Sequence, residues 1–394
     1  MSRGVVYLSG AVRTPIGRFG GGFYGLPAPE LGAAAAREAV ARSGFASEEV
    51  QETVFGCARQ AGVGPNPARQ VSHLAGIPDR VPAYTVNQAC ASGLKAILLA
   101  AREVASGESS PILAGGAENM SRVPYLLDSA RFGARMGHEE LTDGMLRDGF
   151  LCRLCGQMMG ETAENLAREY RISRAEQDRY AAESQQRVER ARERGLFREE
   201  IVAVEVAGPK GSIRRVEEDE HPRDGVTADS LGKLAPVFGA EGTITAGSAS
   251  GITDGGAAVL VSAARPRASR GPLARLVAWT SVGVDPSRMG IGPVPAIRKL
   301  VSNSGISLEQ IDLVEINEAF AAQVLACQRE LHIDPAKLNP NGGAIALGHP
   351  IGCSGARIVV TLMHEMARRE ARYGIAALCV SGGMGVAALL ESAG

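Results

Sequence analysis

The chain has 394 residues, of which 45% are hydrophobic and 22% are charged, a balance that is typical of globular domains and argues against intrinsic disorder. Its 42 basic and 43 acidic residues leave a net charge of −1 without a polybasic block. Binding to nucleic acid or to a membrane surface therefore has no electrostatic support. The 49 glycines exceed the usual share of about 7%, which predicts tight packing or a backbone that approaches a ligand closely.

Cysteine usage and hydropathy bear on where the protein works. The seven cysteines are odd in number and scattered along the chain, which fits a reducing compartment better than a disulfide framework. The first residues lack the apolar core of a secretory signal. The apolar stretch Ile375–Leu390 is short for a membrane span and is interrupted by glycines; two buried strands joined by a turn fit it better. We therefore expect a cytoplasmic protein.

Strands alternate with helices in the first part of the chain. The pattern predicts strands at Gly4–Gly10, Thr53–Cys57, Ala83–Val86 and Pro111–Ala114, and helices at Glu30–Ser43, from about Pro67, and at Ala91–Ser106. Such alternation predicts a mainly parallel sheet that is covered by helices.

The pattern changes between about residues 118 and 250. Two charged segments that are nearly free of glycine predict helices at Thr162–Tyr170 and Ser173–Arg194, and the first residue of the second segment forms a capping-box signature with Glu176. Short polar strands follow. We expect this region to be an inserted loop domain that lies over the sheet.

The alternation resumes near Ala257. It predicts helices at Pro293–Asn303, Ala319–Leu331 and Ile351–Ala371, and strands at Asp312–Ile316, Ile375–Val380 and Gly385–Leu390. A weak repeat accompanies it: a Ser-Gly pair opens an apolar helix, and a strand and a Gly-Gly pair follow, once over residues 92–116 and again over residues 354–383. The repeat fits a duplicated domain, and it equally fits unrelated α/β units.

Cys90 lies where the strand Ala83–Val86 hands over to a helix. A side chain at this turn projects from the carboxyl end of the sheet, where α/β folds bind ligands. The N-terminus of the following helix predicts a lowered thiol pKa and hence a nucleophilic thiolate. The alternative is a buried, inert cysteine.

His349 stands in a loop, residues 339–352, that holds four glycines and two prolines. Such a frame leaves little room for core packing, so a rigidly held histidine is a candidate general base. The alternative is a loop histidine with satisfied hydrogen bonds. The remaining histidines lack comparable surroundings and are interpreted as structural or surface residues: His73, His138, His221, His332 and His364.

Two further candidates occupy strand ends. Cys379 ends a buried strand before a Ser-Gly-Gly turn, where free backbone N–H groups are able to form an oxyanion hole. Asn317 lies where a strand hands over to a helix; a helix N-cap is its alternative role.

Taken together, these segments resemble the thiolase family, the acetyl-CoA C-acyltransferases, over essentially the whole chain. The motifs that carry the resemblance occur in the order Arg13–Gly21, Asn66–Gln70, Asn87–Gly93, Met159–Asn165, Thr245–Gly251, Asn317–Phe320, Gly342–Gly355 and Cys379–Gly385. The resemblance implies an α/β thiolase fold, in which duplicated βαβαβαββ halves form a five-layered α-β-α-β-α core with an inserted loop domain. The halves would be residues 1–270, with the loop domain at about 118–250, and residues 271–394.

The resemblance also implies an enzyme. Thiolases catalyse the reversible CoA-dependent thiolysis of 3-oxoacyl-CoA, or the Claisen condensation of two acyl-CoAs, through an acyl-cysteine intermediate. By resemblance, Cys90 takes the acyl group, His349 accepts its proton and later stabilises a thioester oxyanion, and Cys379 exchanges the α-proton. Asn317 would hold a water in one oxyanion hole, and the backbone N–H groups of Cys90 and Ser381 would form the other.

The remaining contacts that the resemblance implies are with the substrate and its CoA moiety: Met159, Arg223, Ser230, Phe238, Ser250, Met289, Ala319 and Phe320. CoA is a substrate here, and neither a metal nor another cofactor is expected. The family assembles as homo-oligomers, either dimers or dimers of dimers paired through a loop-domain hairpin, here at about Arg122–Arg135.

Several positions depart from the family pattern. Met158 stands where short-chain biosynthetic members carry a histidine, and Phe150 replaces a smaller apolar residue. Both changes favour a degradative role, such as β-oxidation, or a broad chain-length range. Ser381 replaces a glycine, which leaves open a second interpretation as a non-catalytic acyl-CoA- or lipid-binding protein of thiolase fold. The pair Cys152 and Cys155 is either a redox switch or, more in keeping with a covering loop, two unlinked cysteines.

Overall fold

The computed structural model describes residues 4–208 and 211–393. A mixed sheet of ten strands runs through the molecule in the order β12-β13-β14-β11-β1-β10-β5-β3-β4, and the short β2 pairs with β10. In chain order the strands are β1 (Tyr7–Arg13), β2 (Gly17–Arg18), β3 (Glu52–Gly56), β4 (Ala83–Val86), β5 (Ile112–Asn119), β10 (Thr253–Ser262), β11 (Ala274–Gly283), β12 (Leu313–Ile316), β13 (Tyr373–Val380) and β14 (Met384–Ser392).

The two halves of the sheet repeat one strand order. The order β3-β5-β10-β1 in the first half matches β12-β13-β14-β11 in the second. The halves meet where β1 pairs antiparallel with β11, with Leu8 opposite Ala274. In the second half, a single parallel bridge between Val314 and Leu338 occupies the place of β4. The weak sequence repeat is thus a true duplication.

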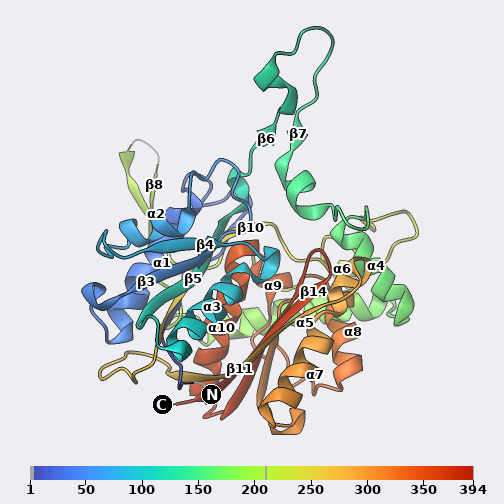
Figure 1. Ribbon diagram of the computed structural model, residues 1–394. Helices are drawn as coiled ribbons and strands as arrows, with labels where there is room; N and C mark the ends of the chain where they lie inside the picture. The colour runs from blue at the N-terminus through green and yellow to red at the C-terminus, as the bar shows by residue number, and fades with distance from the viewer. Residues whose placement is uncertain (1–3, 209–210, 394) are drawn as a thin grey trace.

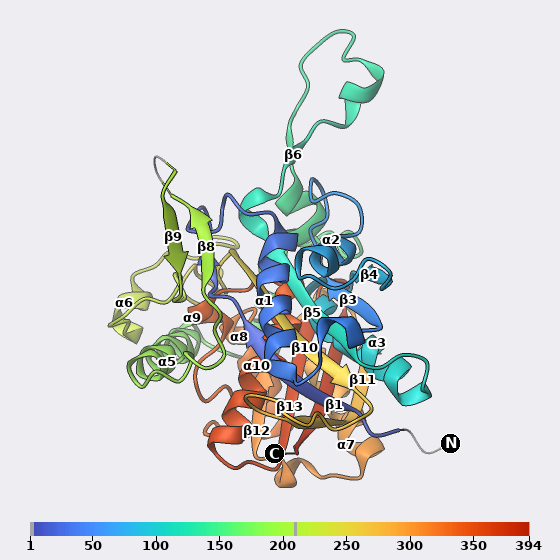
Figure 2. The same cartoon turned by 90° about the vertical axis from the view of Figure 1, so that its left-hand side faces the viewer.

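Helices form three layers around the sheet halves. The helices are α1 (Ala28–Ser43), α2 (Pro67–Leu74), α3 (Ser92–Ser106), α7 (Pro293–Ser304), α8 (Ala321–Leu331) and α10 (Ile351–Arg368). α3 and α10 share one core cluster with residues from both halves and form the central layer, as Figure 1 shows. α1 and α2 cover the outer face of the first half (Figure 2), and α7 and α8 cover that of the second (Figure 1). This confirms the five-layered core.

Strand β14 illustrates why both faces of the sheet are apolar. Its residues Val386 and Ala388 pack into the central layer, whereas Ala387 and Leu389 pack against the outer helices. Because successive side chains of a strand point to opposite faces, a strand buried on both sides is a continuous apolar run. The apolar stretch near the C-terminus is therefore two strands joined by a glycine turn, as predicted.

The expectation of a mainly parallel sheet is wrong. Only the pairs β3–β4, β3–β5 and β12–β13 are parallel. The five other pairings among the long strands are antiparallel. A turn as short as the one between β13 and β14 permits only antiparallel pairing. β10 and β11, which join the halves, were not predicted as separate strands.

Some predicted boundaries also move. β5 extends five residues beyond Ala114, because Gly115 and Gly116 lie inside the strand rather than after it. A Cβ on Gly116 would lie 2.2 Å from the carbonyl oxygen of Gly352, so this glycine permits the close approach of α10. α4 begins at Met159, three residues before the predicted start.

The inserted region covers one end of the sheet. It contains α4 (Met159–Glu169), α5 (Arg174–Glu193), α6 (Ala228–Gly232) and the hairpin β8 (Val204–Ala207) to β9 (Ile213–Val216). The predicted capping box is present, since the Ser173 hydroxyl accepts a hydrogen bond from the N–H of Glu176. The buried guanidinium of Arg13 ties this region to β1 by ion pairs of 2.7 Å to both Glu200 and Asp219.

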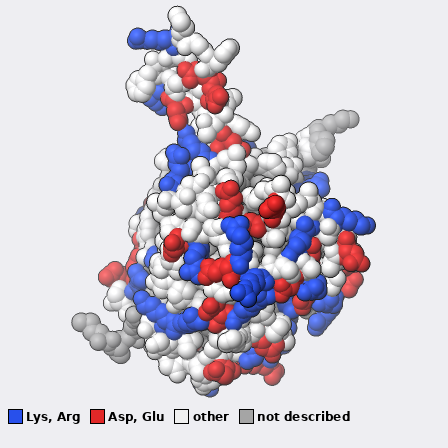
Figure 3. All heavy atoms as spheres, turned by 90° about the vertical axis from the view of Figure 1, so that its right-hand side faces the viewer, with Lys and Arg blue, Asp and Glu red and all other residues white. Residues whose placement is uncertain are grey.

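A long arm projects from the body (Figure 1). Its base is the hairpin of β6 (Tyr125–Leu126) and β7 (Thr142–Asp143). Side chains of both charge signs are interspersed on the face in Figure 3, in keeping with the balanced composition. Within residues 4–208 and 211–393, the structure contains no helix that is both long and apolar enough for a transmembrane span.

Candidate active site

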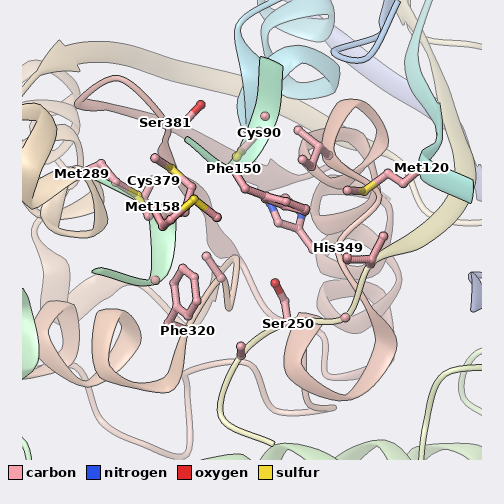
Figure 4. Close-up of a pocket in the computed structure, with 18 of the residues that line it drawn as sticks. Cys90, Met120, Phe150, Met158, Ser250, Met289, Phe320, His349, Cys379 and Ser381 are labelled. Atoms are coloured by element: carbon pink, nitrogen blue, oxygen red, sulfur yellow. The ribbon is translucent and has the colours of Figure 1, made fainter. Parts of the chain in front are cut away.

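A cavity of about 240 Å³ collects most of the predicted site residues. Figure 4 shows Cys90, His349, Cys379 and Ser381 around it, together with the loop-domain residue Met158. The cavity thus lies between the two halves and the loop domain. Its lining includes Cys90, Met159, Phe238, Ser250, Met289, Ala319, Phe320, His349, Cys379 and Ser381 from the predicted set, together with Arg59, Met120, Phe150, Met158, Ile252 and Ile351.

Cys90 sits on a tight turn that strains the backbone. The preceding residue, Ala89, has a φ of 44°, which is unusual for a residue with a side chain. The Asn87 carboxamide oxygen accepts the N–H of Ala89 at 3.0 Å. The Ser92 hydroxyl accepts the N–H of Gln88 at 2.9 Å and donates to the Ala89 carbonyl at 2.7 Å. These bonds hold the sulfur at the cavity, in front of α3.

The expected lowering of the Cys90 pKa is wrong in direction. Burial raises the pKa of this thiol, and the backbone N–H groups of Ser381 and of Cys90 itself only partly oppose the shift. Loss of hydration penalises a buried thiolate more than the helix end stabilises it. Cys90 is therefore a thiol at rest, and it needs a neighbouring base to become a nucleophile.

His349 is held in one tautomer. Its Nδ1 lies 2.5 Å from the Ser354 hydroxyl oxygen, and that hydroxyl is 3.0 Å from the Pro350 carbonyl, to which it donates. The hydroxyl oxygen must then accept from Nδ1–H. Nε2 is then unprotonated, and it accepts a hydrogen bond from the Asn317 side-chain nitrogen at 3.4 Å.

Asn317 does not cap a helix. α8 begins at Ala321, with Phe320 at its N-cap position, so the alternative role for Asn317 is wrong. Its side-chain oxygen is buried and has no hydrogen-bond partner among the described residues. Because a buried acceptor without a partner is costly, this oxygen fits a site for a bound water or for a substrate donor.

Burial and two nearby cations keep His349 neutral. Loss of hydration, followed by the charges of Arg357 and Arg59, lowers its pKa from 6.5 to about 3. A neutral imidazole with an unprotonated Nε2 is the form that accepts a proton from a thiol.

This pKa shift predicts an acid-dependent loss of stability. Because the folded-state pKa lies below the unfolded value of 6.5, the unfolded chain binds the extra proton, and stability falls as pH drops from 6.5 toward 3. Between pH 7 and about pH 4.5, the wild type should lose roughly 2 kcal/mol more than His349→Asn. Urea unfolding of both proteins at the two pH values measures the difference, and parallel losses would contradict the assigned burial of a neutral imidazole.

Cys379 and the turn after it complete the reacting wall. Gly382 and Gly383 have φ values of 84° and 82°, a region that favours glycine. This turn aims the Ser381 N–H at the Cys90 sulfur. Burial, and after it the neighbouring thiols Cys90 and Cys327, raises the pKa of Cys379 well above its ordinary value. Cys379 is therefore held protonated, as a proton donor must be.

The predicted CoA contacts divide between two hollows. Arg223 and Ser230 lie outside the catalytic cavity, in a hollow that they share with His221. The loop Thr245–Gly251 joins the two hollows, because Ala246 and Gly247 line the outer one, whereas Ala249–Gly251 line the inner one.

Sequence reasoning missed two residues that position the site. Ser354 was noted only as part of the repeat, although it sets the tautomer of His349. The buried carboxylate of Glu118, at the end of β5, accepts the N–H groups of Ala58 at 3.0 Å and of Gly352 at 2.9 Å. It thereby ties the segment that follows β3 to the loop that carries His349. No local pattern marks either role, because each depends on contacts that are distant in sequence.

Comparisons with known proteins agree with this geometry. The family models described as "Thiolase, N-terminal domain" and "Thiolase, C-terminal domain" match residues 6–265 and 270–392. The chain belongs to the thiolase family. An acetyl-CoA acetyltransferase of Pseudomonas aeruginosa is 51% identical over 387 residues, which cover 98% of each chain. Another from Cupriavidus necator is 48% identical over 388 residues, covering 98% of this chain and 99% of the relative.

Solved thiolase structures superpose closely. The crystal structure of the Bacillus anthracis acetyl-CoA acetyltransferase has a TM-score of 0.96 at 43% identity and covers 99% of both chains. That of human mitochondrial 3-ketoacyl-CoA thiolase has a TM-score of 0.95 at 40% identity, also over 99% of both chains. These similarities confirm the predicted fold and an acyltransferase enzyme of the thiolase class. They do not support the non-catalytic alternative.

The pair Cys152 and Cys155 lies beside this thiolase site. Both are free thiols, and Cys152 is buried in the cluster that contains Cys379 and Met159. The N–H of Gly156 donates to the Cys152 carbonyl at 2.8 Å, which folds the segment into a tight turn. Cys152 and Cys155 therefore pack behind residues that line the cavity, and neither is itself among the lining residues.

Proposed function

We propose that the protein cleaves 3-oxoacyl-CoA with CoA, and runs the reverse condensation, through an acyl group carried on Cys90. The observation that carries the proposal is the His349 tautomer: Nδ1–H donates to Ser354, and Nε2 is unprotonated and accepts a hydrogen bond of 3.4 Å from Asn317. This base shares one cavity with two thiols, Cys90 and Cys379.

The first half-reaction forms the acyl-enzyme. The Cys90 thiol gives its proton to His349 Nε2, and the sulfur attacks the 3-oxo carbon. The bond between C2 and C3 of the substrate then breaks, and its electron pair becomes the enolate of acetyl-CoA. The Cys379 thiol protonates C2 of this enolate, so that acetyl-CoA leaves and Cys379 is left as a thiolate.

The second half-reaction restores the enzyme. The Cys379 thiolate takes the proton of an incoming CoA thiol, and the CoA sulfur attacks the acyl group on Cys90. The Cys90 sulfur leaves and recovers the proton held by His349, which gives acyl-CoA and the free enzyme. Since nucleophile, base and acid are all protein groups and CoA is a substrate, the scheme uses no metal or redox cofactor.

Two sets of donors would stabilise the developing negative charges. The N–H groups of Ser381 and Cys90 face the Cys90 sulfur, so they suit the oxyanion of a group bound to that sulfur. His349, with a water held at Asn317, suits the enolate oxygen of acetyl-CoA. Donors fixed in a buried site act strongly because they need no reorganisation during the reaction.

The cavity wall bears on the acyl range. Phe150 and Met158 both line the cavity, and Met158 puts a flexible thioether where short-chain relatives of the family carry a histidine. Methionine side chains adapt to ligands of different shape. We therefore infer a degradative or broad chain-length role, of the kind that β-oxidation requires. The seven scattered cysteines support our separate inference of a cytoplasmic location.

A thiolysis series tests this function. The expected result is cleavage of acetoacetyl-CoA, 3-oxohexanoyl-CoA and 3-oxododecanoyl-CoA, because the flexible side chain of Met158 lets the pocket adapt to acyl groups of different length. Loss of the 3-oxoacyl-CoA absorbance on addition of CoA measures the rate. Cleavage confined to acetoacetyl-CoA would contradict the broad range, and no cleavage of any member would contradict the function.

The arm supports a homo-oligomer. Phe132 and Met136 are 86% and 96% exposed, and apolar side chains that protrude this far commonly mark an interface. We propose that the arm pairs two dimers, with further copies of this chain as the partner.

A further inference from the structure

A buried cation stands in the wall of the catalytic cavity. Arg59 lines the cavity with Cys90 and His349, and it is only 8% exposed. Its Nε atom is buried and has no hydrogen-bond partner within the described part of the chain. A buried guanidinium normally carries a matched set of acceptors, since leaving it unpaired is costly.

The charge of Arg59 acts on the Glu118 carboxylate, but the hydrogen bonds of that carboxylate are made with other groups. The Glu118 carboxylate accepts the backbone N–H groups of Ala58, Arg59 and Gly352. No ion pair between the Arg59 guanidinium and an acidic side chain occurs within residues 4–208 and 211–393. The surrounding wall is otherwise largely apolar, with Met120, Phe150 and Ile351 among its residues. The guanidinium thus faces the cavity without a matched protein acceptor.

A glycine in the backbone also leaves space for the Arg59 guanidinium. A Cβ on Gly149 would lie 2.5 Å from one terminal nitrogen of Arg59 and 2.7 Å from its Nε. The glycine therefore permits the guanidinium to rest against the wall beside Phe150, which is the residue that follows it in the chain.

We propose that Arg59 binds a carboxylate at the far end of the acyl group that Cys90 carries, so that the preferred substrates are 3-oxoacyl-CoAs with a terminal carboxylate. Arg59 is then a specificity-determining residue. This inference rests on the proposed thiolysis. Its chemical reason is that a planar guanidinium in a dry pocket matches a carboxylate with two parallel hydrogen bonds, whereas a methyl end would leave the cation unpaired.

A purely electrostatic role makes a different prediction. The charge of Arg59 acts on both Cys90 and His349, so its removal also changes the reactivity of those groups. This change in reactivity should alter the rates of all substrates by the same factor, because every acyl group reacts at Cys90 with His349 as the base. Only a direct contact with the substrate changes the ratio of rates between two substrates of equal length.

The test compares 3-oxoadipyl-CoA with 3-oxohexanoyl-CoA, which have the same number of acyl carbons and differ in the terminal carboxylate. The wild type should have the higher kcat/KM for 3-oxoadipyl-CoA. Arg59→Gln should lower the ratio of the two values by about tenfold to a hundredfold, as expected for a lost hydrogen bond between charged groups. Arg267→Gln, which removes the same charge at an exposed position, should leave the ratio unchanged.

Gly149→Ala provides a second variant that keeps the charge and displaces the guanidinium, and it should also lower the ratio. An unchanged ratio in both variants would overturn the assignment, as would a wild type that prefers 3-oxohexanoyl-CoA. Acetoacetyl-CoA distinguishes a failure of the carboxylate site from a failure of the proposed thiolysis. If it is cleaved while 3-oxoadipyl-CoA is not, the carboxylate site is wrong and thiolysis stands; if none of the three is cleaved, both are wrong.

Discussion

Replacement of Cys90 by alanine should lower kcat/KM for thiolysis by about 10⁴-fold or more, since it removes the only atom to which the acyl group is bonded between the half-reactions. The effect is large because no neighbouring group substitutes for the sulfur. Cys379 is the nearest alternative nucleophile, but burial and the adjoining thiols raise its pKa well above the ordinary value. Rates of thiolysis measured with acetoacetyl-CoA and CoA give the ratio of kcat/KM between the wild type and Cys90→Ala.

Intact-mass spectrometry tests whether Cys90 carries the acyl group. Incubated with acetyl-CoA, the wild type should gain the mass of one acetyl group, and Cys90→Ala should gain none. Cys90→Ser, which keeps the shape of the side chain, should also be inactive at a similar level, because an alcohol is a far weaker acid than a thiol. A Cys90→Ala protein that retains more than about one percent of the wild-type rate would rule out the acyl-cysteine route.

Replacement of Cys379 by alanine should lower thiolysis by about 10³-fold, in the range of a lost general acid, while Cys90 is still acetylated by acetyl-CoA. Acetyl transfer to Cys90 requires the nucleophile and the His349 base, whereas carbon–carbon cleavage also requires a proton for the enolate. Cys379→Ala should therefore lose thiolysis and keep acetylation of Cys90, whereas Cys90→Ala should lose both. Steady-state thiolysis and intact mass of the acetylated protein measure them in parallel.

Cys327→Ala is the matched control for this variant. Cys327 is another fully buried thiol, in α8, whose sulfur lies 3.4 Å from the Gly290 carbonyl oxygen and does not line the catalytic cavity. It should lose some stability through the lost side-chain volume and keep thiolysis within about threefold of the wild type. If Cys379→Ala and Cys327→Ala behave alike, or if Cys379→Ala loses acetylation as well, the assignment of Cys379 as the acid is wrong.

Local pattern accounts for much of the fold. The helices around Glu30–Ser43 and Ser173–Arg194 follow from apolar spacing, glycine and capping signals, which act within a few residues. The direction of strand pairing does not follow from such signals. β11 pairs with β1 only because the two halves meet edge to edge, and the alternation of strands and helices does not indicate that contact.

The residues of the candidate site also fall into those that the local sequence indicates and those whose role depends on the fold. Cys90, His349 and Cys379 stand out in the sequence because each occupies a turn whose residue types are unusual for a core. Ser354 and Glu118 do not, since their roles arise from hydrogen bonds to groups that only the folded chain brings near. The pKa of Cys90 shows the difference most clearly. The sequence predicts the helix N-terminus that would lower this pKa, but it does not predict the burial that raises the pKa by more.

By itself, the sequence determined the family resemblance and predicted the reacting side chains and the approximate limits of the inserted region, because these depend on residue types in a fixed order. The tertiary structure decided which nitrogen of His349 is unprotonated, in which direction the thiol pKa values move, and that Arg59 lines the cavity with no hydrogen-bond acceptor for its Nε among the described residues. Each of these depends on distance and on exclusion of water, and both arise only when residues remote in the chain are packed together.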